Sequence, residues 1–116
     1  TLHYLGLFYL VIVLATMRVC DAGCMINPVN GHVTIPSSWT TIGDWAFEGC
    51  TSLTSVTIGN SVRVISSNAF AKCTSLTSVV IPNSVTSIQF GAFKMCTRLK
   101  SVSISNKIAS LENYVF

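Results

Sequence analysis

The chain has 116 residues, enough for one domain and too few for two. Only 9% of these residues are charged, whereas about a quarter is typical of a soluble domain, and Ser and Thr together number 27. With four acidic residues, two histidines and a net charge of +3, the composition disfavours a conventional enzyme and a nucleic-acid-binding protein.

An apolar stretch, residues 2–17, opens the chain and is followed by Arg18. A membrane span needs about 20 apolar residues, so this stretch is short for one. It fits the hydrophobic region of a secretory signal peptide, with Cys20 and Ala22 as the small residues before a cleavage point. We therefore predict a signal peptide over residues 1–22. An uncleaved membrane anchor and a buried helix are the alternatives.

Residues 23–32 are expected to form a lead-in that caps the segment after them. Ala22-Gly23-Cys24 also resembles the end of a bacterial lipobox, in which case Cys24 would be a lipidated N-terminus. Asp21 stands where that motif has Leu, so the match is weak. The state of Cys24, lipidated, paired or free, stays open at this point.

A period of 23 residues organises positions 33–116. Val33 has counterparts at Val56, Val79 and Val102, and Phe47 has counterparts at Phe70, Phe93 and Phe116. No insertion or deletion interrupts this register, which predicts about three and a half stacked units. Because the array stops within a unit and residue 1 is Thr, we expect the chain to be a fragment of a longer protein.

Each unit divides into two halves with different periodicities. Val56 and Ile58 stand two residues apart among β-branched neighbours, which predicts a short strand with one buried face. Gly, Pro, Asn and Ser follow the strand as turn signals. In the other half, Ile65, Ala69 and Cys73 stand four residues apart, which predicts a short helix or a tight helical turn.

Stacking would align equivalent apolar side chains into ladders along the solenoid axis, with neighbouring strands about 4.8 Å apart. The predicted core ladders contain Val56, Ile58, Phe70, Cys73, Leu76, Val79, Ile81, Phe93 and Cys96. Such a core explains how a chain with so few charges can fold.

The unit that begins at Leu76 and runs through Pro82, Phe93 and Cys96 resembles the BspA-like leucine-rich repeat, whose pattern is LxxLxIPxxVxxIxxxAFxxC. The resemblance covers residues 33–116. It implies an α/β-type repeat solenoid, a right-handed arc with a parallel β-sheet on the concave face and short helical turns on the convex face. The resemblance also implies a secreted or surface protein, of a family associated with adhesion to host proteins or other cells. The resemblance implies no catalytic residues.

Cys50, Cys73 and Cys96 share one repeat position, where we expect them to act as small buried hydrophobes. A spacing of 23 residues fits no zinc pattern, and no His or second Cys flanks any of the three. We therefore predict no metal and no other cofactor.

The exposed side of the strands is the candidate partner-binding surface. If Val56 and Ile58 point inward, alternation turns the residues beside them outward. The outward positions of the concave face are Thr34, Ser55, Thr57, Ser78, Val80, Ser101 and Ser103. They make an uncharged lattice of hydroxyls and small groups, which either binds a partner or serves only to solvate the sheet.

Two further groups of residues have simple structural interpretations. The cations of the last third are Lys94, Arg98, Lys100 and Lys107. They could attract an acidic ligand such as a sulfated glycan, but solvated loop positions are the simpler interpretation. Trp39 and Trp45 occur only in the first unit, where we expect them to close the open end of the core rather than to bind a partner.

Nucleophilic catalysis is disfavoured, because His32 precedes the repeats and no acid has a fixed relation to it. The sequence predicts a non-enzymatic secreted or cell-surface protein that binds an extracellular protein or glycan through the concave face. We expect no nucleic-acid partner, and a membrane only through an uncleaved anchor or a lipidated Cys24. The alternative is a structural spacer, or an ectodomain fragment of a larger surface protein or receptor whose recognition or signalling domain lies elsewhere.

Overall fold

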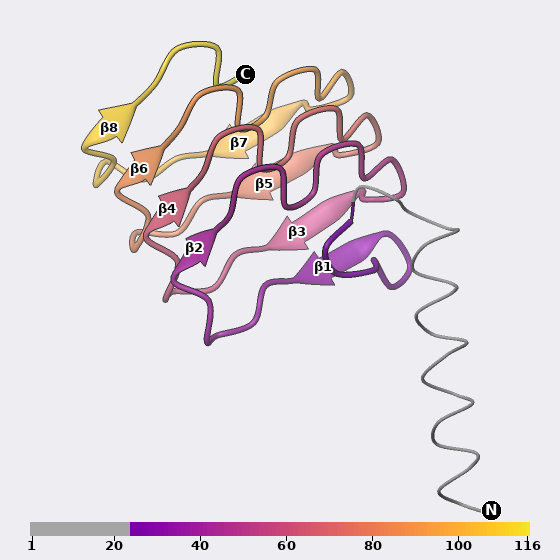
Figure 1. The fold of residues 1–116 in the computed structure, drawn as a ribbon, viewed down its shortest axis with the longest axis horizontal. Helices are drawn as coiled ribbons and strands as arrows, with labels where there is room; N and C mark the ends of the chain where they lie inside the picture. Colours follow the sequence, from indigo (N-terminus) through magenta and orange to yellow (C-terminus); the bar gives the residue numbers. More distant parts are fainter. Residues whose placement is uncertain (1–23) are drawn as a thin grey trace, which may run out of the picture.

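The structure is a computed structural model that describes residues 24–116, so the signal peptide predicted over residues 1–22 lies outside the described residues. The described chain winds into a solenoid of parallel strands, with two sheets running along its axis (Figure 1). This is the stacked parallel arrangement that the 23-residue period predicts. The part of the chain that the structure describes contains no helix of the length and apolarity that a membrane crossing requires.

The first sheet contains the strands that the alternating pattern predicts. In spatial order they are β1 (His32–Thr34), β3 (Ser55–Thr57), β5 (Ser78–Val80) and β7 (Ser101–Ser103). All neighbours are parallel, and each residue pairs with the one 23 positions later, so that Val33 lies beside Val56. The sequence period is thus the register of the strands. This is the sheet that the family resemblance assigns to the concave face.

A second sheet replaces part of the predicted helical half. Its strands are β2 (Thr41–Ile42), β4 (Val64–Ile65), β6 (Ser87–Ile88) and β8 (Ser110–Leu111), again parallel and in that order. Ile65, which we predicted on a helix face, is a strand residue. No helix occurs within residues 24–116, so the short helical turns are not confirmed.

Left-handed backbone positions explain why no helix forms in the loops. In the second unit, Asn68 and Lys72 have φ values of 56° and 58°, and a right-handed helix cannot continue through such residues. The equivalent positive-φ residues are Trp45, Gly91 and Tyr114 for the first position, and Gly49 and Met95 for the second. The loops instead stack through backbone hydrogen bonds between units, such as Phe70 N–H to the carbonyl of Ala92 at 2.7 Å.

The core is built from both sheets and from the loops that join them. Of the predicted ladder residues, Val56, Ile58, Phe70, Cys73, Leu76, Val79, Ile81 and Phe93 are buried, whereas Cys96 is half-buried. Phe47, Phe70 and Phe93 stack with their ring centroids 5.1 and 5.3 Å apart. Phe116 extends the stack at 5.7 Å from Phe93 but is 54% exposed, because it has a ring neighbour on one side only.

Residues 24–31 are fastened to the first unit. Cys24 forms a disulfide with Cys50, and the N–H of Met25 donates to the carbonyl of Ala46 at 2.9 Å. Cys50 is fully buried, as the repeat pattern predicts, but unlike Cys73 and Cys96 it belongs to a disulfide. A covalent bond thus holds the lead-in against the first unit.

The two tryptophans of the first unit have different environments. Trp39 is half-buried and packs against the core, as expected of a residue that closes its end. Trp45 is 57% exposed and stands at the left-handed position of its loop, with a φ of 54°. The prediction that both residues cover the core is wrong for Trp45.

Candidate functional site

The outward side of the β1–β3–β5–β7 sheet is the candidate site, and we call it the hydroxyl face. In each strand the central valine turns inward and the two flanking residues turn outward, as strand alternation requires. The hydroxyl face consists of His32, Thr34, Ser55, Thr57, Ser78, Val80, Ser101 and Ser103. The structure places all seven residues chosen from the sequence on one face, together with His32.

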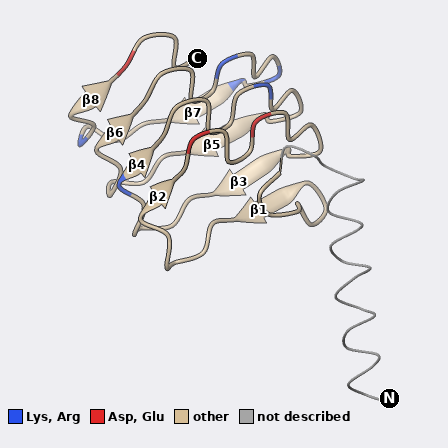
Figure 2. Cartoon of the chain, viewed as in Figure 1, with Lys and Arg blue, Asp and Glu red and all other residues tan. Residues whose placement is uncertain are grey.

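The hydroxyl face is open to solvent and uncharged. Its exposed hydroxyl residues are Thr34, Thr57, Ser78, Ser101 and Ser103. Val80 is 65% exposed and adds an apolar surface in the middle of the face. The four strands contain no Lys, Arg, Asp or Glu, and they are tan in Figure 2. The face therefore presents neutral hydrogen-bonding groups in rows, one strand spacing apart.

His32 is the residue of the hydroxyl face that the sequence analysis missed. Its Nδ1 lies 2.6 Å from Ser55 Oγ, and its Nε2 lies 3.0 Å from Thr57 Oγ1. A neutral imidazole donates from one nitrogen and accepts at the other, so hydroxyls satisfy both. The strand register pairs His32 with Ser55. Applying the 23-residue step to the position before Val33 would therefore have identified His32 from the sequence.

The contact between His32 and Ser55 lacks the third member of a catalytic triad. In such a triad a carboxylate holds the second ring nitrogen, whereas here the hydroxyl of Thr57 holds it. Among the described residues, no group of three or more His, Cys, Asp or Glu side chains could hold a metal ion. The arrangement is therefore suited to binding through hydrogen bonds.

The cations of the last third lie in two separate places. Lys94, Arg98 and Lys100 lie between β6 and β7, whereas Lys107 lies in the turn between β7 and β8. Figure 2 shows blue segments on both of these connections, well apart. None of these four residues belongs to the hydroxyl face, so its neutrality does not depend on ion pairing.

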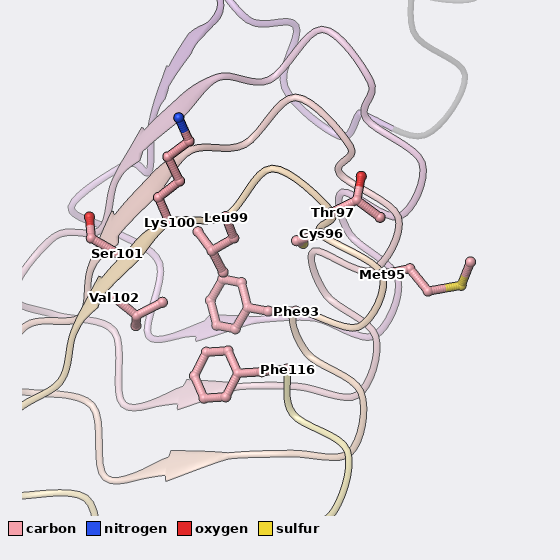
Figure 3. A pocket seen from close by; sticks show the side chains of 9 residues that line it. All are labelled: Phe93, Met95, Cys96, Thr97, Leu99, Lys100, Ser101, Val102 and Phe116. Atoms are coloured by element: carbon pink, nitrogen blue, oxygen red, sulfur yellow. The ribbon is translucent and has the colours of Figure 1, made fainter.

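A pocket of about 350 Å³ lies at the last unit. It is lined by Phe93, Met95, Cys96, Thr97, Leu99, Lys100, Ser101, Val102 and Phe116. Figure 3 shows the rings of Phe93 and Phe116 one above the other, with the Met95 and Lys100 side chains pointing away from them. The two rings thus line the pocket together.

Cys96 in this pocket and Cys73 in the unit before it are neighbouring free thiols. The neighbouring Cys96 thiol, together with burial, raises the pKa of the Cys73 thiol. The Cys73 thiol in turn lowers the pKa of Cys96, against the opposing effect of the burial of Cys96. Cys96 is therefore the first of the two to ionise, and it is the one that solvent reaches.

Comparison with known families finds a repeat model over most of the described chain. The BspA type leucine rich repeat region matches residues 27–116 in six copies. No curated protein sequence matches the chain.

Several solved bacterial structures resemble the solenoid. A leucine-rich repeat protein of T. pallidum shares 34% identity at a TM-score of 0.71, over 73% of this chain and 40% of its own. The pneumococcal vaccine antigen PcpA shares 25% identity at 0.60, over 67% and 19%. A leucine-rich repeat protein from Bacteroides ovatus shares 29% identity at 0.57, over 71% and 27%. The chain thus spans less than half the length of each of these proteins.

Proposed function

The chain belongs to the BspA-type leucine-rich repeat family, and on this basis we propose that it is a non-enzymatic binding module whose hydroxyl face holds an extracellular protein or glycan. The observation that carries the proposal is the hydroxyl face itself, an exposed sheet surface without a charged side chain. Solenoid proteins commonly bind partners on such extended surfaces.

The chemistry of the hydroxyl face favours a neutral partner. Hydroxyls both donate and accept hydrogen bonds, so they match the hydroxyls of a sugar or the backbone amides of a protein. Each such hydrogen bond contributes only about 0.5–1.5 kcal/mol, so affinity must come from many contacts. Val80 offers an apolar contact at the centre. Stable protein interfaces use about 20–30 residues a side, so these eight positions support weak binding by this chain alone.

We place this module outside the cytoplasm, secreted or at the cell surface. The signal peptide predicted over residues 1–22 supports this placement. The disulfide between Cys24 and Cys50 does so independently, because structural disulfides persist in oxidising compartments. One of the structural neighbours is described as a vaccine antigen.

A spacer function is the second candidate, because the chain covers less than half the length of each of the similar structures. The chain spans 40%, 19% and 27% of the three neighbours, so recognition could reside in a part of a longer protein. Backbone hydrogen bonds that link one unit to the next, such as Lys72 N–H to the carbonyl of Lys94 at 2.7 Å, would suit a stiff element.

One binding experiment separates the two candidates. The purified protein is applied to a glycan array and to a panel of purified extracellular-matrix and serum proteins. The double variant Ser78→Glu/Ser101→Glu places two charges on the hydroxyl face. The control Thr51→Glu/Thr74→Glu places two charges on exposed loop positions. Loss of binding in the first variant and retention in the second supports the proposal. Retention in both would place the binding site away from the hydroxyl face, and no binding by the unaltered protein favours the spacer.

A further inference from the structure

A second, chemically different groove lies on the turns that lead from the first sheet to the second. Its volume is about 490 Å³, within the range of small-molecule sites of about 300–1,000 Å³. It is lined by Thr40, Asn60, Ser61, Arg63, Asn83, Ser84 and Thr86. These residues come from the turns before β2, β4 and β6, so the groove crosses three consecutive units. We call it the turn groove.

The backbone holds these turns in register. The N–H of Arg63 donates to the carbonyl of Thr40 at 2.7 Å, and the N–H of Thr86 donates to the carbonyl of Arg63 at 2.9 Å. Thr40, Arg63 and Thr86 therefore form one column, in which Arg63 has a neutral neighbour on each side. A second column sets Asn60 beside Asn83, one unit apart. The backbone thus holds the turns that form the groove in register across three units.

All seven lining residues are polar, and Arg63 carries the charge. The connecting turns, residues 36–40, 59–63, 82–86 and 105–109, contain no Asp or Glu, and Lys107 adds a second cation in the last of them. The described acids have other partners: Asp44 accepts from Ser67 N–H, Glu48 pairs with Lys72, and Glu112 accepts from Phe90 N–H. Within the described residues, Arg63 therefore has no carboxylate to compensate it.

We propose that the turn groove binds an acidic saccharide, with a sulfate group on the Arg63 guanidinium and sugar hydroxyls on the Asn60 and Asn83 amides. A guanidinium presents a planar fork of N–H donors that matches an oxyanion in two bonds. The amides both donate and accept, which sugar hydroxyls require. Ser84 also lines the groove, and its hydroxyl is buried without a protein partner. The absence of apolar lining residues disfavours a hydrophobic ligand or peptide anchor.

This inference does not rest on the hydroxyl face, which is neutral and belongs to the β1–β3–β5–β7 sheet. The two sites therefore have separate variants. Arg63 is exposed, so its replacement should leave the fold intact.

The experiment measures, by calorimetric titration, binding of a sulfated heparin disaccharide and of its unsulfated counterpart. The unaltered protein should bind the sulfated form and not the unsulfated form. Arg63→Gln should weaken binding about ten- to a hundredfold, the usual effect of losing a charged hydrogen bond. Arg63→Lys keeps the charge without the fork and should weaken it less. The control Arg98→Gln removes an equal charge from a loop between β6 and β7 and should bind normally.

Each other outcome overturns the proposal. Equal loss in Arg63→Gln and Arg98→Gln would indicate diffuse electrostatic attraction, and equal binding of the two disaccharides would remove the role of the sulfate. No binding of the sulfated form at millimolar concentration would exclude the site. Inorganic sulfate is the competitor that tests the role of the sugar. If it displaced the disaccharide and bound equally tightly, the groove would be a site for a free anion and not for a saccharide. Ser78→Glu/Ser101→Glu should leave the titration unchanged whether or not the hydroxyl face binds a partner.

Discussion

A disulfide joins Cys24 to Cys50, which stands 26 residues later. The same separation recurs in the hydrogen bonds that later cysteines make to backbone carbonyls of the preceding unit. Cys73 Sγ donates to the carbonyl of Phe47, 26 residues earlier, at 3.1 Å, and Cys96 Sγ donates likewise to Phe70. The residue that stands 26 positions before Cys50 is Cys24 itself. The disulfide takes the place of that contact and attaches the lead-in.

The disulfide should supply a large part of the stability of the first unit. In the loop-entropy description, a closed loop of this length stabilises the fold by about 3–4 kcal/mol. Urea unfolding of the oxidised protein should therefore show a higher midpoint than unfolding in dithiothreitol. Cys24→Ser should unfold like the reduced protein and should not respond to the reductant. Identical midpoints with and without reductant would contradict this function of the disulfide.

The phenylalanine ladder predicts unequal costs for the same deletion at two positions. Phe70 is fully buried between two rings, so Phe70→Ala should cost about 3–5 kcal/mol. Phe116 is 54% exposed and has one ring neighbour, so Phe116→Ala should cost about 1 kcal/mol or less. Chemical denaturation of the two variants measures both values. Equal losses would be inconsistent with the different environments of the two rings.

The left-handed loop positions predict a difference between two glycines. Gly91 is buried with a φ of 66°, and an added Cβ there would collide with Oδ1 of Asn68. Gly91→Ala should therefore destabilise the protein by about 1–3 kcal/mol. Gly43 is exposed and an added Cβ would meet nothing within 4 Å, so Gly43→Ala should be neutral or stabilise by up to about 1 kcal/mol. Thermal unfolding of both variants tests the pair, and a neutral Gly91→Ala would count against this loop geometry.

The two free thiols should react in a fixed order. Cys96 has a lowered pKa and is half-buried, so its thiolate should form and alkylate at lower pH than an ordinary cysteine. Cys73 has a raised pKa and is fully buried, so it should resist alkylation until the protein unfolds. Iodoacetamide labelling across pH, followed by peptide mass spectrometry, gives the order. Faster labelling of Cys73, or equal rates, would contradict the assignment.

The repeat period predicted the stacked strands because strand register and sequence period are the same quantity. Val33, Val56 and Val79 pair in the structure at the step that the sequence shows. His32 was missed because the first strand begins one residue before the recurring valine, where His replaces the Ser of later units. The groove around Arg63 was missed because its Asn and Ser residues recur as ordinary turn residues, whereas Arg63 itself stands between Thr40 and Thr86 and does not recur.

The short helical turns were not confirmed, and the backbone conformation of this half has no constant sequence signal. Trp45, Asn68, Gly91 and Tyr114 share one left-handed position, although only Gly favours that conformation strongly. Spacing of four residues between Ile65, Ala69 and Cys73 arises from a strand followed by tight turns. The disulfide could not be predicted from the repeat pattern, because Cys24 precedes the repeats and its separation of 26 residues from Cys50 differs from the repeat period.

Mapping the bound partner onto the backbone tests the central claim most directly. Amide chemical shifts of ¹⁵N-labelled protein are followed while the strongest-binding component of the arrays is added. Binding on the hydroxyl face predicts that the largest changes occur in β3, β5 and β7, with small changes in the loops between β4 and β5. Changes confined to those loops or to the second sheet, with the first sheet unmoved, would contradict the account.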